Sequence, residues 1–231
     1  MSTMAFLQAR MGSTRLPGKV LMPIQGQSIL ERAVRRLKAS PAVDEVVVLT
    51  SCRDVDDVVE AEARRLRVPA YRGPELDVLA RFYEAAVRFR PDIIVRATAD
   101  NPLIDIGSIT RIVTGLRSRG LDLCMENGLP YGAATEAVTA EALTRAHLES
   151  HTARDREHVT LYIKEHPESF RVGYLRAPES VRFPDLRVTV DTCEDFSFVE
   201  NVICRLPEND APLPLDLYIP HALNIIDEKR P

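Results

Sequence analysis

The sequence has 231 residues, of which 45% are hydrophobic and 28% are charged, and its formal net charge is −4. This length and composition indicate a globular protein with one large domain, and the acidic balance argues against a general nucleic-acid-binding protein. The apolar stretch near the N-terminus is interrupted by Gln8 and Arg10, so we predict neither a signal peptide nor a membrane span. The four cysteines are far apart and form no Cys-x-x-Cys pair, which argues against a zinc knuckle and favours reduced thiols in a cytoplasmic protein.

Strand-like and helix-like patterns alternate along the chain as far as Met125. Short apolar runs predict strands at 4–7, 45–50, 68–71, 93–95 and 121–125. Apolar residues at helical spacing predict helices at 29–37, 54–66, 77–89 and 108–116, the first of them capped by Ser28. Strands and helices that alternate with short turns are typical of an α/β protein with a mostly parallel, doubly wound sheet.

The pattern changes after Glu126. A turn-rich loop at 127–132 precedes predicted helices at 140–148 and 155–164, strands at 170–175 and 186–190, and a helix at 194–204. We interpret 1–206 as one domain, in which about 127–185 forms a small subregion. The proline-punctuated tail, 207–231, is expected to pack on this domain or on a second subunit.

The loop that follows the first predicted strand combines glycines, hydroxyl groups and cations. It reads Gln8-Ala9-Arg10-Met11-Gly12-Ser13-Thr14-Arg15-Leu16-Pro17-Gly18-Lys19. Glycines let backbone N–H groups approach phosphate oxygens, while hydroxyl donors and cations offset the phosphate charge. Lys19 is followed by Val20, so the loop is not a Walker A motif. A basic surface turn is the alternative, but three cations this close to a strand end favour phosphate binding.

Two aspartates directly follow predicted strands. Asp100 comes after the fourth strand, and Asp191 comes at the end of the apolar run 186–190. Ligands of open α/β sheets bind beyond the carboxyl ends of the strands, so both carboxylates are expected to meet the first loop there. Mg²⁺ commonly takes one or two protein carboxylates together with phosphate oxygens and water. The alternative is that each aspartate belongs to a turn or a helix cap.

Residues 8–21 resemble the opening of the cytidylyltransferases of spore-coat-polysaccharide type, which are related to the 3-deoxy-manno-octulosonate and acylneuraminate cytidylyltransferases. The resemblance extends from Met4 to about Val202. It implies that 1–206 is a nucleotidyltransferase domain and that its part at about 127–185 serves acceptor binding and dimerisation. It implies a nucleotide-diphospho-sugar transferase-like fold and a reaction in which CTP and an acceptor give a CMP-linked product and pyrophosphate. It also implies that Asp100 and Asp191 hold Mg²⁺, because they match the aspartates of two family motifs.

The resemblance assigns further roles. The implied catalytic residues are Arg10, Arg15, Lys19, Asp100 and Asp191. The implied nucleotide-binding residues are Gln8, Ala9, Arg10, Gly12, Ser13, Thr14, Arg15, Lys19, Arg72, Asp77 and Thr98. The implied acceptor-binding residues are Glu136, Arg156 and His158. Without the resemblance, Arg72, Asp77 and Arg81 would be interpreted as surface charges.

Three positions depart from the family pattern. Ala134 replaces a common aspartate in the acceptor half, Val188 a usual tryptophan and Cys193 a usual proline. Because the missing carboxylate would bind hydroxyl groups, we expect a small anionic acceptor and poor use of large keto-sugar acids.

The sequence thus predicts a Mg²⁺-dependent cytidylyltransferase that acts on CTP and a small anionic acceptor and forms a homodimer, with no nucleic-acid or membrane partner. A glycosyltransferase that uses a nucleotide sugar is one alternative, although Asp100-Asn101-Pro102 lacks the expected Asp-x-Asp motif. A catalytically silent nucleotide-binding protein is the other.

Overall fold

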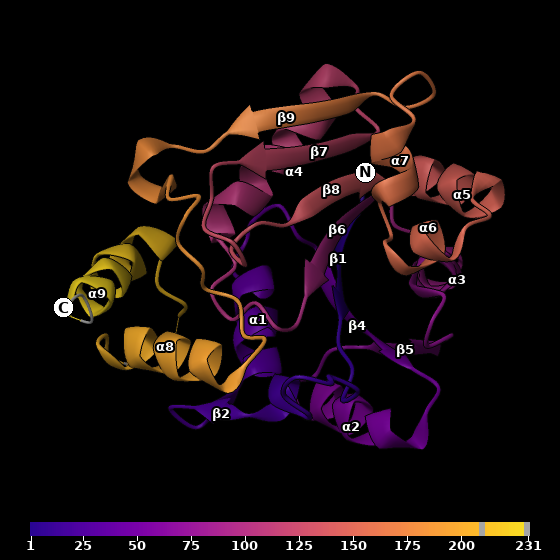
Figure 1. The fold of residues 1–231 in the computed structure, drawn as a ribbon. Helices are drawn as coiled ribbons and strands as arrows, with labels where there is room; N and C mark the ends of the chain where they lie inside the picture. Colours follow the sequence, from indigo (N-terminus) through magenta and orange to yellow (C-terminus); the bar gives the residue numbers. More distant parts are fainter. Residues whose placement is uncertain (208–210, 229–231) are drawn as a thin grey trace.

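The computed structural model describes residues 1–207 and 211–228. A seven-stranded sheet in the order β5-β4-β1-β6-β8-β7-β9 forms its centre (Figure 1). The strands are β1 (Thr3–Gln8), β4 (Glu45–Ser51), β5 (Ala70–Gly73), β6 (Ile93–Thr98), β7 (Leu123–Asn127), β8 (Glu136–Thr139) and β9 (Val172–Arg176). Neighbouring strands are parallel except where β8 pairs with β6 and β7. The predicted mostly parallel α/β architecture is confirmed.

Helices cover both faces of this sheet (Figure 1). They are α1 (Ile29–Lys38), α2 (Asp57–Arg65), α3 (Val78–Phe89), α4 (Ile106–Arg119), α5 (Ala140–Glu149), α6 (Ala153–Glu157), α7 (Leu161–Glu165), α8 (Cys193–Cys204) and α9 (Leu215–Glu228). Ala5 and Leu7 of β1 pack in one core with α1, α2 and α4, whereas Phe6 packs in another with α3, α5 and α7. This alternation follows from the two-residue period of a strand, and it explains why the central strands are apolar throughout.

The N-terminus of α1 is capped by the residue that precedes it. The Ser28 side chain accepts a hydrogen bond from the Glu31 backbone N–H at 3.0 Å, which confirms the predicted cap of α1. A short hairpin, β2 (Pro23–Ile24) with β3 (Gln27–Ser28), leads into this helix.

A third cluster of buried apolar side chains lies around α8 and α9. Leu215, Tyr218 and Ile219 of α9 are buried there with Val199 and Val202 of α8. Figure 1 shows the two helices side by side, away from the sheet. Of the predicted tail 207–231, residues 208–210 and 229–231 lie outside the described residues. Within the described ranges, no helix is both long and apolar enough to cross a lipid bilayer.

Several predicted elements were wrong. The run 186–190 is not a strand: apart from a single bridge between Tyr131 and Arg187, its backbone bonds to neighbouring loops, and its apolar side chains face the core around α8 and α9. The helix predicted at 155–164 is divided into α6 and α7. Strand β8 and helix α9 were not predicted, because a four-residue strand shows too little alternation and the prolines obscured the helical period.

Candidate active site

A cavity of about 520 Å³ opens beyond the carboxyl ends of β1 and β6. Most of the predicted site residues line it, namely Gln8, Ala9, Arg10, Gly12, Ser13, Thr14, Arg15, Lys19, Thr98, Asp100, His158 and Asp191. Val20, Glu75, Leu76, Val78, Arg81, Arg96, Ala99, Ala153 and Glu157 complete the lining. The first loop therefore forms one wall, as expected for ligand binding at the carboxyl edge of an open sheet.

The backbone of the first loop folds back on Met11. The Met11 carbonyl accepts hydrogen bonds from the N–H groups of Ser13 at 2.8 Å and Gly18 at 3.2 Å. Gly18 has a φ of 72°, a left-handed conformation that glycine adopts without steric cost. The short 3₁₀ turn Lys19–Leu21 then directs the Lys19 side chain inward.

A buried carboxylate holds the base of this loop. Asp56, which is 2% exposed, accepts a hydrogen bond from the Met11 N–H at 2.7 Å and a second from the Ser51 hydroxyl. Nothing local in the sequence distinguishes Asp56 from the aspartates beside it, so its role was not predicted.

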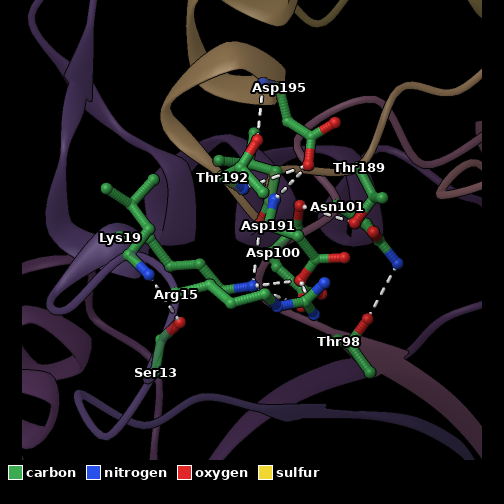
Figure 2. A network of polar contacts seen from close by, with 12 residues as sticks. Ser13, Arg15, Lys19, Thr98, Asp100, Asn101, Thr189, Asp191, Thr192 and Asp195 are labelled. Atoms are coloured by element: carbon green, nitrogen blue, oxygen red, sulfur yellow. Dashed lines mark hydrogen bonds and ion pairs between the residues drawn. The ribbon is translucent and has the colours of Figure 1, made fainter.

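The Lys19 ammonium group lies between the two predicted metal ligands (Figure 2). Its Nζ is 3.0 Å from Asp100 Oδ2, 2.8 Å from Asp191 Oδ1 and 2.7 Å from the Val190 carbonyl. These contacts use all three N–H donors of the ammonium group. The first loop and the two aspartates are therefore joined in one polar network.

Asp191 is surrounded by cations. Arg15 lies 3.0 Å from Oδ1, beside Lys19, and Arg187 donates to Oδ2 at 2.6 Å. Burial acts to raise the pKa of Asp191, but the hydrogen bonds and charges of Lys19, Arg187 and Arg15 outweigh it, so this pKa lies below its usual range. Asp191 is therefore ionised at neutral pH.

Arg187 fixes the orientation of Asp191 but was not predicted. Its Nε donates to Asp195 at 2.9 Å, and its guanidinium lies 4.8 Å from the centre of the Tyr131 ring. Asp195 and Thr192 form the capping box of α8. Thr192 thus caps α8, and the Asp191 side chain is not the cap but lines the cavity. An arginine in irregular backbone has no sequence signal that marks such a role.

The donor set of the two aspartates fits a magnesium ion. Both carboxylates already converge on one cation, and no hydrogen bond to Asp100 Oδ1 is found among the described residues. Oxygen ligands of this kind are those that Mg²⁺ prefers, with phosphate and water completing its shell. In the part of the chain that the structure describes, no group of three or more potential metal-ligand side chains is found.

Two of the implied nucleotide-binding residues do not line the cavity. Arg72 pairs with Asp57 and Glu60 and donates to the Ser51 carbonyl. Asp77 caps α3 and lies 2.7 Å from Arg156, which links α3 to α6.

Two of the implied acceptor-binding residues also point elsewhere. Arg156 is committed to Asp77 and to the His147 carbonyl. Glu136 pairs with Arg96 and Lys164 and accepts from the Thr160 hydroxyl at 2.6 Å. Burial acts to raise the pKa of Glu136, yet these partners lower it to about 2. Only His158 of the three lines the cavity, at an exposed position.

Arg81 and Arg96 also line the cavity, although neither is among the implied site residues. Arg81 is 2% exposed, although residue patterns alone placed it on the surface, and it donates to the carbonyls of Pro74 and Glu75. An arginine on an amphipathic helix or in a strand is usually solvated, so only the packed structure distinguishes these two.

Comparison with known proteins identifies the family. A family model described as cytidylyltransferase matches residues 4–226. The spore coat polysaccharide biosynthesis protein SpsF of Bacillus subtilis (strain 168) is 37% identical over 199 residues, which are 84% of this chain and 83% of that protein. The structure of a cytidylyltransferase from Leptospira borgpetersenii serovar Hardjo-bovis (strain JB197) superposes with a TM-score of 0.87 at 30% identity and covers 99% of this chain and 94% of the other.

The fold also occurs in a more distant protein. The structure of CMP:2-keto-3-deoxy-manno-octonic acid synthetase complexed with CTP has a TM-score of 0.66 at 18% identity, and the match covers 89% of this chain and 99% of that one. These findings confirm the family resemblance of the first loop. The chain belongs to the cytidylyltransferase family and is a CTP-dependent nucleotidyltransferase.

Proposed function

We propose that this protein transfers CMP from CTP to a small anionic acceptor, with release of pyrophosphate and with Mg²⁺ as cofactor. The observation that carries the proposal is the contact of Lys19 with both Asp100 and Asp191 at the wall of a cavity lined by the first loop. This arrangement of cations and carboxylates supports a site for a triphosphate and its metal ion.

The reaction needs positioning and charge stabilisation more than covalent help from the protein. An acceptor oxygen forms a bond to the α-phosphorus while the bond from that phosphorus to the bridging oxygen of the β-phosphate breaks, so the electron pair leaves with pyrophosphate. Arg10 and Arg15 are exposed at the cavity and can offset the charge on the leaving group. An acceptor that is already a carboxylate or phosphate needs no protein base, because it carries no proton on the attacking oxygen.

Asp100 and Asp191 would hold the metal ion. When bound, Mg²⁺ supplies Lewis-acid stabilisation of phosphate charge. Lys19 and Arg187 keep the Asp191 carboxylate ionised and oriented toward the cavity. The chain's own part in catalysis is thus to hold two charged oxygen donors at a fixed distance from the loop.

The named relatives support the choice of partners. The distant structural neighbour is a synthetase complexed with CTP, and SpsF is a protein of polysaccharide biosynthesis. We propose cytosine as the base and a sugar acid, phosphate, phosphonate or carboxylate compound as the acceptor. We also propose a cytoplasmic homodimer in which the subregion 127–185 contributes the interface.

A pyrophosphate-release assay tests the proposal. CTP, UTP and dTTP are each offered with Mg²⁺ to a panel of sugar acids, phosphates, phosphonates and carboxylates, and thermal stabilisation by each nucleotide is measured in parallel. We expect CTP to stabilise the fold most and to give pyrophosphate with a small anionic acceptor. Equal stabilisation by UTP would contradict the base assignment, and efficient transfer only to a large keto-sugar acid would contradict the acceptor assignment.

A further inference from the structure

Arg96 brings an unassigned cation to the wall of the cavity. It lies on β6 two residues before Thr98, so both side chains project from the same face of the strand. Both residues line the cavity, and the Arg96 side chain is 23% exposed. The Arg96 side chain is therefore half-buried at the cavity wall, close to the end of β6 that precedes Asp100.

Only part of the Arg96 guanidinium is used within the protein. Its Nη1 donates to Glu136 Oε2 at 3.1 Å. Its Nε is buried and has no hydrogen-bond partner among the described residues, and no hydrogen bond from Nη2 is found there either. Nη2 is thus the nitrogen left for a ligand, because Nη1 donates to Glu136 and Nε is buried, and its N–H groups can donate to an oxygen of a carboxylate or phosphate.

The charge of Arg96 is not fully neutralised by Glu136. That carboxylate also pairs with Lys164 and accepts a hydrogen bond from Thr160. Two cations and one carboxylate leave one positive charge in this cluster. Glu157 also lines the cavity, but it is exposed, so solvent and salt screen its charge.

We infer that Arg96 binds the anionic group of the acceptor through hydrogen bonds from Nη2, and that it thereby selects anionic over neutral acceptors. Glu136 acts as a positioning residue that fixes the guanidinium through Nη1. The inference rests on the proposed function for the identity of the second substrate, but the anion site itself can be tested without turnover.

Arginine side-chain NMR of the full chain provides the test. The Arg96 Nε–H resonance is assigned by its absence in Arg96→Lys and followed with saturating CTP and Mg²⁺ during titrations of acetate, inorganic phosphate and glycerol. We expect a saturable shift with acetate or phosphate and none with glycerol. The anion that gives the tighter binding identifies the acid group for which the site is built.

The variants separate recognition from a structural role. Followed through the Thr98 backbone amide, Arg96→Lys should weaken anion binding about ten- to a hundredfold, because a charge-assisted hydrogen bond from Nη2 is lost while the charge remains. The matched control is Lys164→Met, which removes the other cation from Glu136 but does not line the cavity. It should weaken anion affinity much less than Arg96→Lys does, because it lowers the charge of the cluster but removes no hydrogen bond to the anion.

Several outcomes would overturn the inference. An Arg96 resonance that neither anion shifts, an equal response to glycerol, or an equal loss in Lys164→Met would each do so. If Arg96→Lys does not fold, the resonance is assigned by through-bond correlation to the Arg96 backbone, and the wild-type titrations still decide. CTP binding is read separately from the Gly12 and Gly18 amides, so failure of the proposed function is distinguishable from failure at Arg96.

Discussion

The Lys19 ammonium lies 2.8 Å from Asp191 Oδ1, although 172 positions separate the two residues in the sequence. The same nitrogen lies 3.0 Å from Asp100, so one cation compensates two carboxylates that would otherwise repel each other. The contact between Lys19 and Asp191 joins the first loop to the segment that precedes α8. The loop is therefore held at the cavity by contacts within the protein.

Replacement of Lys19 should affect both activity and stability. In Lys19→Met the two carboxylates lose their shared donor, so we expect the free energy of unfolding to fall by about 1–3 kcal/mol. The rate of pyrophosphate release should fall about 10²–10³-fold, as for loss of one electrostatic contact in an active site. Urea unfolding and the pyrophosphate assay measure the two effects. Lys38→Met, at an exposed position of α1, is the control and should change neither.

The two aspartates should be needed for turnover. Asp100→Asn and Asp191→Asn keep the size of the side chain but remove the charge that would bind Mg²⁺, so turnover should be lost while far-ultraviolet circular dichroism stays unchanged. Stabilisation of the fold by CTP should also lose its dependence on Mg²⁺. Asp92→Asn, whose side chain is 57% exposed, is the matched control. Near wild-type turnover of either site variant at saturating Mg²⁺ would mean that the residue is not a metal ligand.

Arg187 should set the pH at which activity is lost on acidification. The pKa of Asp191 is lowered by Lys19, Arg187 and Arg15 against the effect of burial. Arg187→Met removes one of these causes, so the pKa rises and Asp191 becomes protonated at a higher pH. The acidic limb of the pH–rate profile should therefore move to higher pH. Arg187→Lys retains the charge and should shift the limb less, and an unmoved limb in Arg187→Met would contradict the assignment.

Glu136 should stabilise the fold in a pH-dependent way. Its pKa is lowered from 4.5 to about 2 in the folded protein. A carboxyl group whose pKa is lower in the folded than in the unfolded protein stabilises the fold at pH values above its unfolded pKa. This stabilisation is lost as the pH falls from about 4.5 toward 2. Glu136→Gln should therefore reduce the free energy of unfolding at pH 7 by on the order of 3 kcal/mol, and the difference from wild type should shrink below about pH 4.5. Urea unfolding at several pH values measures this, with the exposed Glu45→Gln as control; a pH-independent difference would contradict the linkage.

The predicted homodimer can be tested at the edge strand. Tyr174 is 53% exposed on β9, which ends the sheet within the subregion 127–185. Exposed aromatic side chains on a sheet edge are typical of surfaces that another chain covers. We expect solution scattering to give a dimer mass that Tyr174→Lys converts to monomer. The control Val87→Lys, on α3, should stay dimeric. A concentration-independent monomer mass for the wild type would refute the prediction.

Local patterns in the sequence determined the central sheet and the first wall of the cavity. The run Val46-Val47-Val48-Leu49 predicted a strand covered on both faces, and all four residues are at most 2% exposed in β4. Gln8 to Lys19 follows β1 directly, so chain connectivity alone brings the loop to the carboxyl edge of the sheet. The same rule placed Asp100 beside the loop. These features are encoded by neighbouring residues, which is why they can be read without a structure.

Tertiary structure alone decided which of the remaining charges face the cavity. Arg156 and Glu136 are of the residue types that binding sites use, but both form ion pairs within the protein. Arg156 pairs with Asp77, and Glu136 pairs with Arg96 and Lys164. Conversely, Arg187 reaches Asp191 from irregular backbone. Such pairs join segments whose proximity depends on strand order and on the antiparallel insertion of β8, and no local pattern records that order. The sequence therefore specifies the chemistry available to this protein, and the packing of distant segments specifies which residues apply it.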